Sequence, residues 1–152
     1  MLAYDAIYFP ADGRPPCVVS LKATPLSTSV VDQRWPFQCG CIPHPEMYME
    51  KIAEGLVSRS WRFQIADRLD CMNRTFATPY VIFYPTVSRD GMPFRVNKCA
   101  KELHDEHFVD ARAWRGDIIV AKFRDEACSS MMDASMADFP ILKIWLSQRP
   151  GP

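Results

Sequence analysis

The sequence predicts an α+β fold, in which two or three helices pack on a mostly antiparallel sheet of about five or six strands. Short β-branched and aromatic runs are joined by local turns, as in hairpins. Helical periodicity occurs in only a few segments, and these do not alternate regularly with the strands. The 152 residues are 48% hydrophobic and 24% charged, which is typical of a single globular domain spanning residues 1–152.

The first predicted element is an N-terminal β-hairpin. Residues 4–10 and 17–23 are rich in β-branched and aromatic side chains, which favour strands. Between them, Asp12 and Gly13 tolerate the positive φ angles of a tight turn. We therefore expect the two strands to pair locally.

The next part of the chain predicts a loop, a helix and two strands. Residues 24–44 contain three prolines and are expected to form a long ordered loop. Apolar side chains then recur at spacings of three and four, which predicts an amphipathic helix over residues 45–55 with proline in its first turn. Residues 60–66 alternate like a half-exposed strand, and the more continuously apolar residues 78–87 predict a central strand.

The C-terminal part predicts two more helices and the most deeply buried strand. Residues 92–96 follow a turn signal and can form a return strand, and residues 97–108 have the apolar spacing of a short surface helix. Residues 115–124 form the clearest buried strand in the chain. After an acidic, Met-rich loop, Asp138 and Pro140 provide a good start for a final helix.

Charge and cysteine usage limit the partners and the compartment. Lys plus Arg equals Asp plus Glu at 18 each, so no overall positive field attracts nucleic acid. No secretory signal and no apolar run of membrane-spanning length is present in the sequence. The six cysteines are therefore expected to be free thiols in a soluble, cytoplasmic protein.

Cys39, Cys41 and His44 form the nearest approach to a metal motif. Zinc requires four ligands, and its cysteine pairs normally have two to four intervening residues, whereas this pair has only Gly40 between them. The alternative is a turn with buried thiols that leads into a helix. A metal at this position requires another cysteine or histidine to fold close to the pair.

A second candidate site lies in the sequence "HDEH". His104 and His107, three positions apart, would share one helix face, with Asp105 and Glu106 as neighbouring carboxylates. Such a group can provide an acid–base pair or hold a metal. The alternative is an exposed helix end, since the spacing differs from that of zinc proteases.

Aromatic and methionine side chains give a third candidate. Trp35, Trp61 and Trp114 lie next to basic residues or prolines and can line a ligand-binding cleft. Methionines 131–136 can form an adaptable contact surface. The alternative for both groups is a place in the hydrophobic core or at its rim.

The ends of the chain resemble a group of fungal proteins. The N-terminal "YFPADGRPPCVVSL", the strand "RGDIIVAKF" and the final "DFPILKIWL" are similar to segments of small uncharacterised proteins of mushroom-forming (basidiomycete) fungi. The resemblance implies a fungal, intracellular, single-domain protein. It implies no activity and no site residues.

These observations favour a binding or interaction domain that contacts a protein or small-molecule ligand through aromatic and Met-rich loops. No catalytic motif and no nucleotide-binding glycine loop is present in the sequence, and no cofactor, nucleic acid or membrane partner is expected. One alternative is a small cofactor-independent enzyme, an isomerase, cyclase or hydrolase, using a His/carboxylate or His/Cys pair. A second alternative is a zinc-stabilised module.

Overall fold

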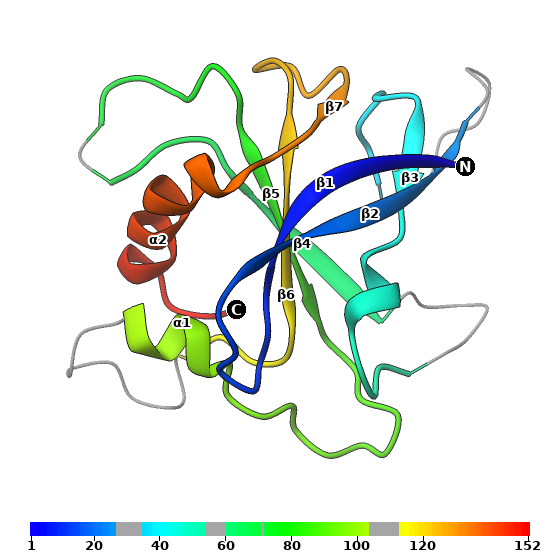
Figure 1. Ribbon diagram of the computed structural model, residues 1–152, viewed down its shortest axis with the longest axis vertical. Helices are drawn as coiled ribbons and strands as arrows, with labels where there is room; N and C mark the ends of the chain where they lie inside the picture. The colour runs from blue at the N-terminus through cyan, green and yellow to red at the C-terminus, as the bar shows by residue number, and fades with distance from the viewer. Residues whose placement is uncertain (27–34, 54–59, 71, 104–112) are drawn as a thin grey trace.

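An antiparallel sheet forms the centre of the computed structural model, which describes residues 1–26, 35–53, 60–70, 72–103 and 113–152. Within these residues the sheet has seven strands in the order β3-β2-β1-β6-β5-β4, and β7 pairs with β6. The strands are β1 (Leu2–Phe9), β2 (Cys17–Pro25), β3 (Cys41–Pro43), β4 (Trp61–Ala66), β5 (Tyr80–Pro85), β6 (Ile118–Phe123) and β7 (Met131–Met132). In Figure 1 the β1–β2 hairpin crosses over the other long strands, so the sheet is strongly curled.

The predicted hairpin and the predicted central strands are confirmed. β1 and β2 pair antiparallel from Leu2 opposite Ala23 to Tyr8 opposite Cys17. β6 lies between β1 and β5, which explains why its sequence is apolar at almost every position. β4 is at the end of the sheet, consistent with its alternating sequence.

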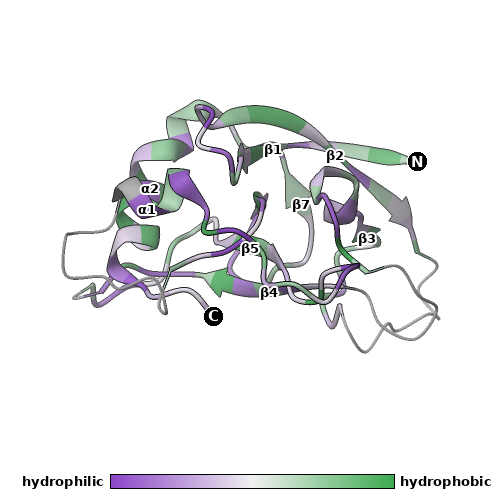
Figure 2. Cartoon of the chain, turned by 90° about the horizontal axis from the view of Figure 1, so that it is seen from below, coloured by the Kyte–Doolittle hydropathy of each residue, from purple (hydrophilic) through white to green (hydrophobic). Residues whose placement is uncertain are grey.

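Both faces of the sheet are covered. Along β6, Ile118 and Val120 join one core cluster, while Ile119, Ala121 and Phe123 join the other. The first cluster lies under two helices, α1 (Lys98–Leu103) and α2 (Phe139–Gln148). The second lies under the loops and short strands around β3, on the opposite side of the molecule (Figure 2). We call these the helix side and the loop side of the sheet.

The helical part of the fold is smaller than the sequence predicts. The final helix is confirmed as α2, which is introduced by a capping box at Ser135. The predicted helix at 97–108 begins as the six-residue α1, and its remainder, from residue 104, lies outside the described residues. Within the described part of the chain, α2 is therefore the one helix longer than two turns. No described helix has the length and apolar character needed to cross a membrane.

The predicted helix at 45–55 is wrong over residues 45–53, and residues 54–55 lie outside the described part of the chain. A short 3₁₀ helix (Pro45–Tyr48) ends at Met49, whose backbone is extended, and Lys51 has a φ of +61°. Hydrogen bonds to distant segments replace helical ones here, since Ala53 N–H donates to the carbonyl of Val87 at 2.9 Å. The apolar side chains at this spacing, Met49 and Ile52, pack in the loop-side core from a non-helical backbone.

Three short segments also differ from prediction. Residues 92–96 form no strand, and Val96 makes only an isolated bridge with Arg115. The predicted loop at 24–44 ends in β3, and the Met-rich loop contains β7. Two- and three-residue strands carry too few side chains to show an alternating pattern in the sequence, which is why neither was predicted.

Candidate functional site

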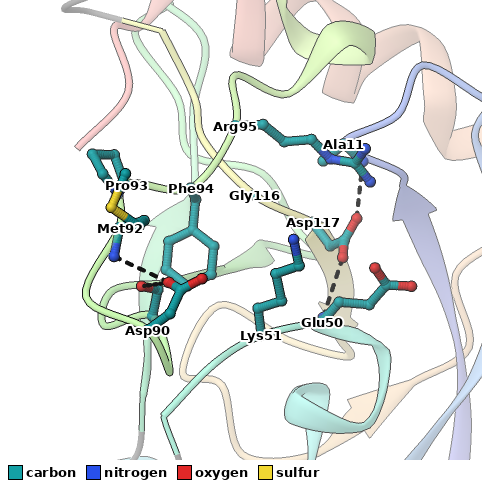
Figure 3. A pocket seen from close by; sticks show the side chains of 11 residues that line it. Ala11, Glu50, Lys51, Asp90, Met92, Pro93, Phe94, Arg95, Gly116 and Asp117 are labelled. Atoms are coloured by element: carbon teal, nitrogen blue, oxygen red, sulfur yellow. Dashed lines mark hydrogen bonds between the residues drawn. The ribbon is translucent and has the colours of Figure 1, made fainter.

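A cavity of about 230 Å³ opens at the end of the sheet where β6 begins. Its walls come from four separate parts of the chain: the hairpin turn at Ala11, the segment after the 3₁₀ helix, the loop 88–95 and residues 116–117 (Figure 3). Five charged residues line it, namely Glu50, Lys51, Asp90, Arg95 and Asp117. This mixture of charges makes the cavity the strongest candidate for a functional site.

Asp117 forms the buried floor of the cavity. Its Oδ1 accepts a hydrogen bond from the backbone N–H of Ala11 at 2.9 Å, and its Oδ2 accepts one from the N–H of Glu50 at 3.4 Å. Tyr8 also contacts this carboxylate, and burial together with the Asp117 charge raises the pKa of Tyr8 well above its usual value. Asp117 thus connects the hairpin, the segment after the 3₁₀ helix and β6, and its oxygens are occupied by protein donors.

Asp90 is held in a similar way on the opposite wall. Its Oδ1 accepts hydrogen bonds from Met92 N–H at 3.0 Å and from the Ser88 hydroxyl at 2.9 Å. These two donors, the backbone one first, lower the pKa of Asp90, and the positive charge of Lys51 adds to the effect. Asp90 is therefore an ionised carboxylate that organises the loop 88–95.

The two cations of the cavity are left without such partners. Among the described residues, the side chains of Lys51 and Arg95 make no hydrogen bond or ion pair. The Lys51 side chain rises between the Phe94 ring and Asp117, and Asp117 lies between it and the Glu50 carboxylate (Figure 3). The left-handed backbone of Lys51 is held by Arg89 N–H, which donates to the Lys51 carbonyl at 2.6 Å. Three carboxylates and two cations thus line the cavity, and the Lys51 ammonium and the Arg95 guanidinium are the groups that have side-chain hydrogen-bond donors to offer an incoming molecule.

A second, wider cavity of about 520 Å³ lies on the other side of the same loop. Both cavities share Ser88, Met92, Pro93 and Phe94 in their walls. The loop 88–95 therefore contributes side chains to both cavities. One of them, Met92, is 65% exposed.

The structure does not assemble the zinc site suggested by Cys39, Cys41 and His44. Nε2 of His44 lies 2.5 Å from Oγ1 of Thr24, and its Nδ1 lies 3.0 Å from Oε1 of Glu46. Among the described residues, no three His, Cys, Asp or Glu side chains gather as a metal site. The alternative reading, a turn with buried thiols, matches the positions of both cysteines.

The two thiols do lie together, on the loop side of the sheet. Their sulfur atoms are 4.0 Å apart, and the indole N–H of Trp35 donates to Cys39 Sγ at 3.4 Å. The hydrogen bond with Cys41 lowers the pKa of Cys39 to about 6, against the opposing effect of burial, and Trp35 adds to the lowering. The same contact and burial raise the pKa of Cys41. Cys39 is therefore the more acidic of the two thiols.

The three candidate tryptophans lie in the core. Trp35 and Trp61 pack on the loop side with ring centroids 6.4 Å apart, whereas Trp114 packs on the helix side, 6.1 Å from Trp145. None of them lines either cavity. Their burial matches the alternative role as core residues. Met131 is likewise buried in the core, while Met136 is exposed.

The acid–base candidates His104, Asp105, Glu106 and His107 lie outside the described residues. The acid–base role of these four residues therefore stays a prediction from the sequence.

Sequence reasoning missed the charged residues of the cavity. The helical spacing of residues 45–55 predicts a helical position for Lys51, and Asp90 lies in the turn signal Arg89-Asp90-Gly91 that precedes residues 92–96. The one available signal was Asp117, a carboxylate directly before the most buried strand, where a charge needs partners. Its partners come from distant parts of the chain, so the sequence alone could not identify them.

Comparison of the chain with protein-family models, with curated proteins and with solved structures finds no match.

Proposed function

We propose that this protein is a binding domain for a small anionic molecule, which occupies the cavity beside Lys51 and Arg95. One observation carries the proposal: the Asp117 and Asp90 carboxylates of the cavity accept protein hydrogen bonds, while the Lys51 and Arg95 side chains donate none within the described part of the chain. A carboxylate or phosphate group can accept hydrogen bonds from both cations. This proposal keeps the predicted role of a binding domain but moves the binding surface away from the predicted tryptophans and methionines 131–136, which do not line the cavity.

The size and the walls of the cavity support a small ligand with an apolar part. A cavity of about 230 Å³ is below the roughly 300–1,000 Å³ of sites for drug-sized molecules. Phe94 and Met92 provide apolar surface next to Lys51. A ring or short alkyl chain can contact them while the anionic group faces the cations.

Calorimetric titration at constant ionic strength tests the proposal with three probes: inorganic phosphate, malonate and phenyl phosphate. Saturable binding to one site is expected, with phenyl phosphate binding most tightly because its ring can contact Phe94. Lys51→Gln and Arg95→Gln should each weaken binding about tenfold, the effect of losing one charge-assisted hydrogen bond.

Lys143→Gln is the matched control, because this exposed lysine lies on α2. It should leave the affinity unchanged. Equal losses in the Lys51 and Lys143 variants, or no saturable binding of any probe, would refute the proposed site.

We further propose that the protein works in the cytoplasm of a basidiomycete fungus. The five described cysteines are free, which supports a reducing compartment. The fungal source is supported by the resemblance of the chain ends described above.

A further inference from the structure

Three sulfur atoms from distant parts of the chain meet on the loop side of the sheet. Cys41 Sγ lies 4.0 Å from Cys39 Sγ and 3.8 Å from the thioether sulfur of Met131, a residue 90 positions away. The exposed fractions of Cys39, Cys41 and Met131 are 8%, 0% and 1%. The proposed anion-binding cavity uses none of these residues.

The two sulfur–sulfur distances from Cys41, 4.0 Å to Cys39 and 3.8 Å to Met131, are those of neighbouring ligands in a flat three-coordinate metal site. Sulfur bonded to a metal at about 2.3 Å in such a site lies about 4.0 Å from the next sulfur ligand. Thiolate and thioether ligands are soft and select Cu(I). We propose that Cys39, Cys41 and Met131 form a binding site for one Cu(I) ion.

Zinc fits the same residues poorly. It requires four ligands, usually nitrogen, oxygen or thiolate sulfur, and it gains little from a thioether. His44, the only histidine of the described residues, has both ring nitrogens on Thr24 and Glu46. Cu(I) needs no ligand beyond the three sulfur atoms.

The neighbours of the sulfur atoms suit a copper–thiolate group. The Trp35 indole donates to Cys39 Sγ at 3.4 Å, and the Tyr4 hydroxyl hydrogen-bonds with Cys41. When Cu(I) binds, both thiols lose their protons to solvent, and the resulting complex carries one negative charge. The two donors orient the ligands and stabilise this charge.

Two of the proposed ligands lie in β-strands, and the turn between the two cysteines is exposed. Cys41 is the first residue of β3 and pairs with Pro25, and Met131 in β7 pairs with Phe123 of β6. Gly40, between the two cysteines, is exposed, has a φ of +77° and has open space around it. The exposed turn at Gly40 thus lies directly between the two cysteine ligands in the chain.

Competition with a chromophoric chelator tests the inference. Reduced protein is titrated without oxygen with Cu(I), supplied as its acetonitrile complex, in the presence of bicinchoninate. The native protein should withdraw one equivalent from the chelator. Cys39→Ser and Cys41→Ser should abolish this, and Met131→Leu should weaken it by more than about 100-fold, the upper end of losses outside the ligand shell.

The controls separate a built site from surface binding and from misfolding. Cys17→Ser removes an exposed thiol and should change nothing. Met131→Leu conserves volume and should fold like the native protein, as circular dichroism can verify. X-ray absorption at the copper edge should show a shell of three sulfur atoms at about 2.3 Å. Unchanged affinity in Met131→Leu, a nitrogen or oxygen shell, or loss of copper in Cys17→Ser would overturn the site.

Discussion

Asn97 shows how a single buried side chain holds the region around the cavity. Its side-chain amide donates to the carbonyls of Phe9 at 2.9 Å and Gly116 at 2.7 Å. Its oxygen accepts a hydrogen bond from the N–H of Ala100 at 3.0 Å, at the start of α1. The side chain is fully buried, so water cannot replace any of these contacts.

Replacing Asn97 with alanine should strongly destabilise the fold. Two carbonyls and one N–H would lose their partners, and we expect the free energy of unfolding to fall by about 2–4 kcal/mol. Urea unfolding measures this change. Asn73→Ala is the control, because Asn73 is exposed, and it should change the stability by less than about 0.5 kcal/mol. Equal stability of the two variants would show that Asn97 has no such role.

For individual residues, contacts between residues close in the sequence could be predicted, whereas contacts between residues far apart in the sequence could not. The sequence identified Cys39 and Cys41 as a pair, because only Gly40 lies between them. It could not connect Cys41 with Met131, 90 positions away, or Glu50 with Asp117, 67 positions away. Such contacts depend on the strand order, which no local pattern specifies.

Asp138 connects secondary-structure elements on the helix side. Its Oδ1 accepts hydrogen bonds from the Lys122 ammonium at 2.8 Å and the Tyr80 hydroxyl at 2.6 Å, and its Oδ2 accepts one from Ser135 N–H at 2.8 Å. Burial opposes ionisation of this carboxyl, but the donors, Lys122 first, outweigh burial and lower its pKa. One carboxylate therefore joins β5 and β6 to the start of α2.

The lowered pKa of Asp138 predicts how stability depends on pH. Its ionised form stabilises the fold above the unfolded pKa of about 4, and this contribution is lost as the pH falls through the lower folded pKa. Asp138→Asn should reduce the free energy of unfolding near neutral pH by about 1–3 kcal/mol. It should also flatten the acid dependence that the native protein shows below about pH 4.

Urea unfolding at a series of pH values measures both effects. Asp67→Asn serves as the control, since this aspartate is exposed, and it should keep the native pH dependence. If Asp138→Asn retained the full acid dependence, other carboxyl groups would be responsible for it.

Among the elements, prediction succeeded where the local pattern and the tertiary environment agree. The hairpin, β6 and α2 carry strong local signals, namely a turn, a continuous apolar run and a start at Asp138 and Pro140. The segment 45–55 carried a helical spacing, but its backbone bonds to the loop 88–95 instead. Tertiary hydrogen bonds outweighed a weak helical preference there.

In the whole molecule, the two sides of the sheet have different kinds of side chains in their cores. The helix side is a closed core around Trp114 and Trp145, whereas the loop side carries the three sulfur atoms. The cavity beside Lys51 and Arg95 lies at the end of the sheet where the hairpin turn meets the start of β6, two elements that can be followed in Figure 1. Because the net charge of the chain is zero and the cavity has three carboxylates and two cations, the proposed binding of an anion would depend on direct hydrogen bonds from Lys51 and Arg95 and not on a positive field.

Amide chemical shifts of isotope-labelled protein, recorded during titration with phenyl phosphate at constant ionic strength, test most directly whether an anionic ligand binds in this cavity. The shifts should concentrate in residues 50–51, 88–95 and 116–117 and should disappear in Lys51→Gln. Shifts concentrated on α2, or unchanged shifts in the Lys51→Gln variant, would contradict binding in this cavity.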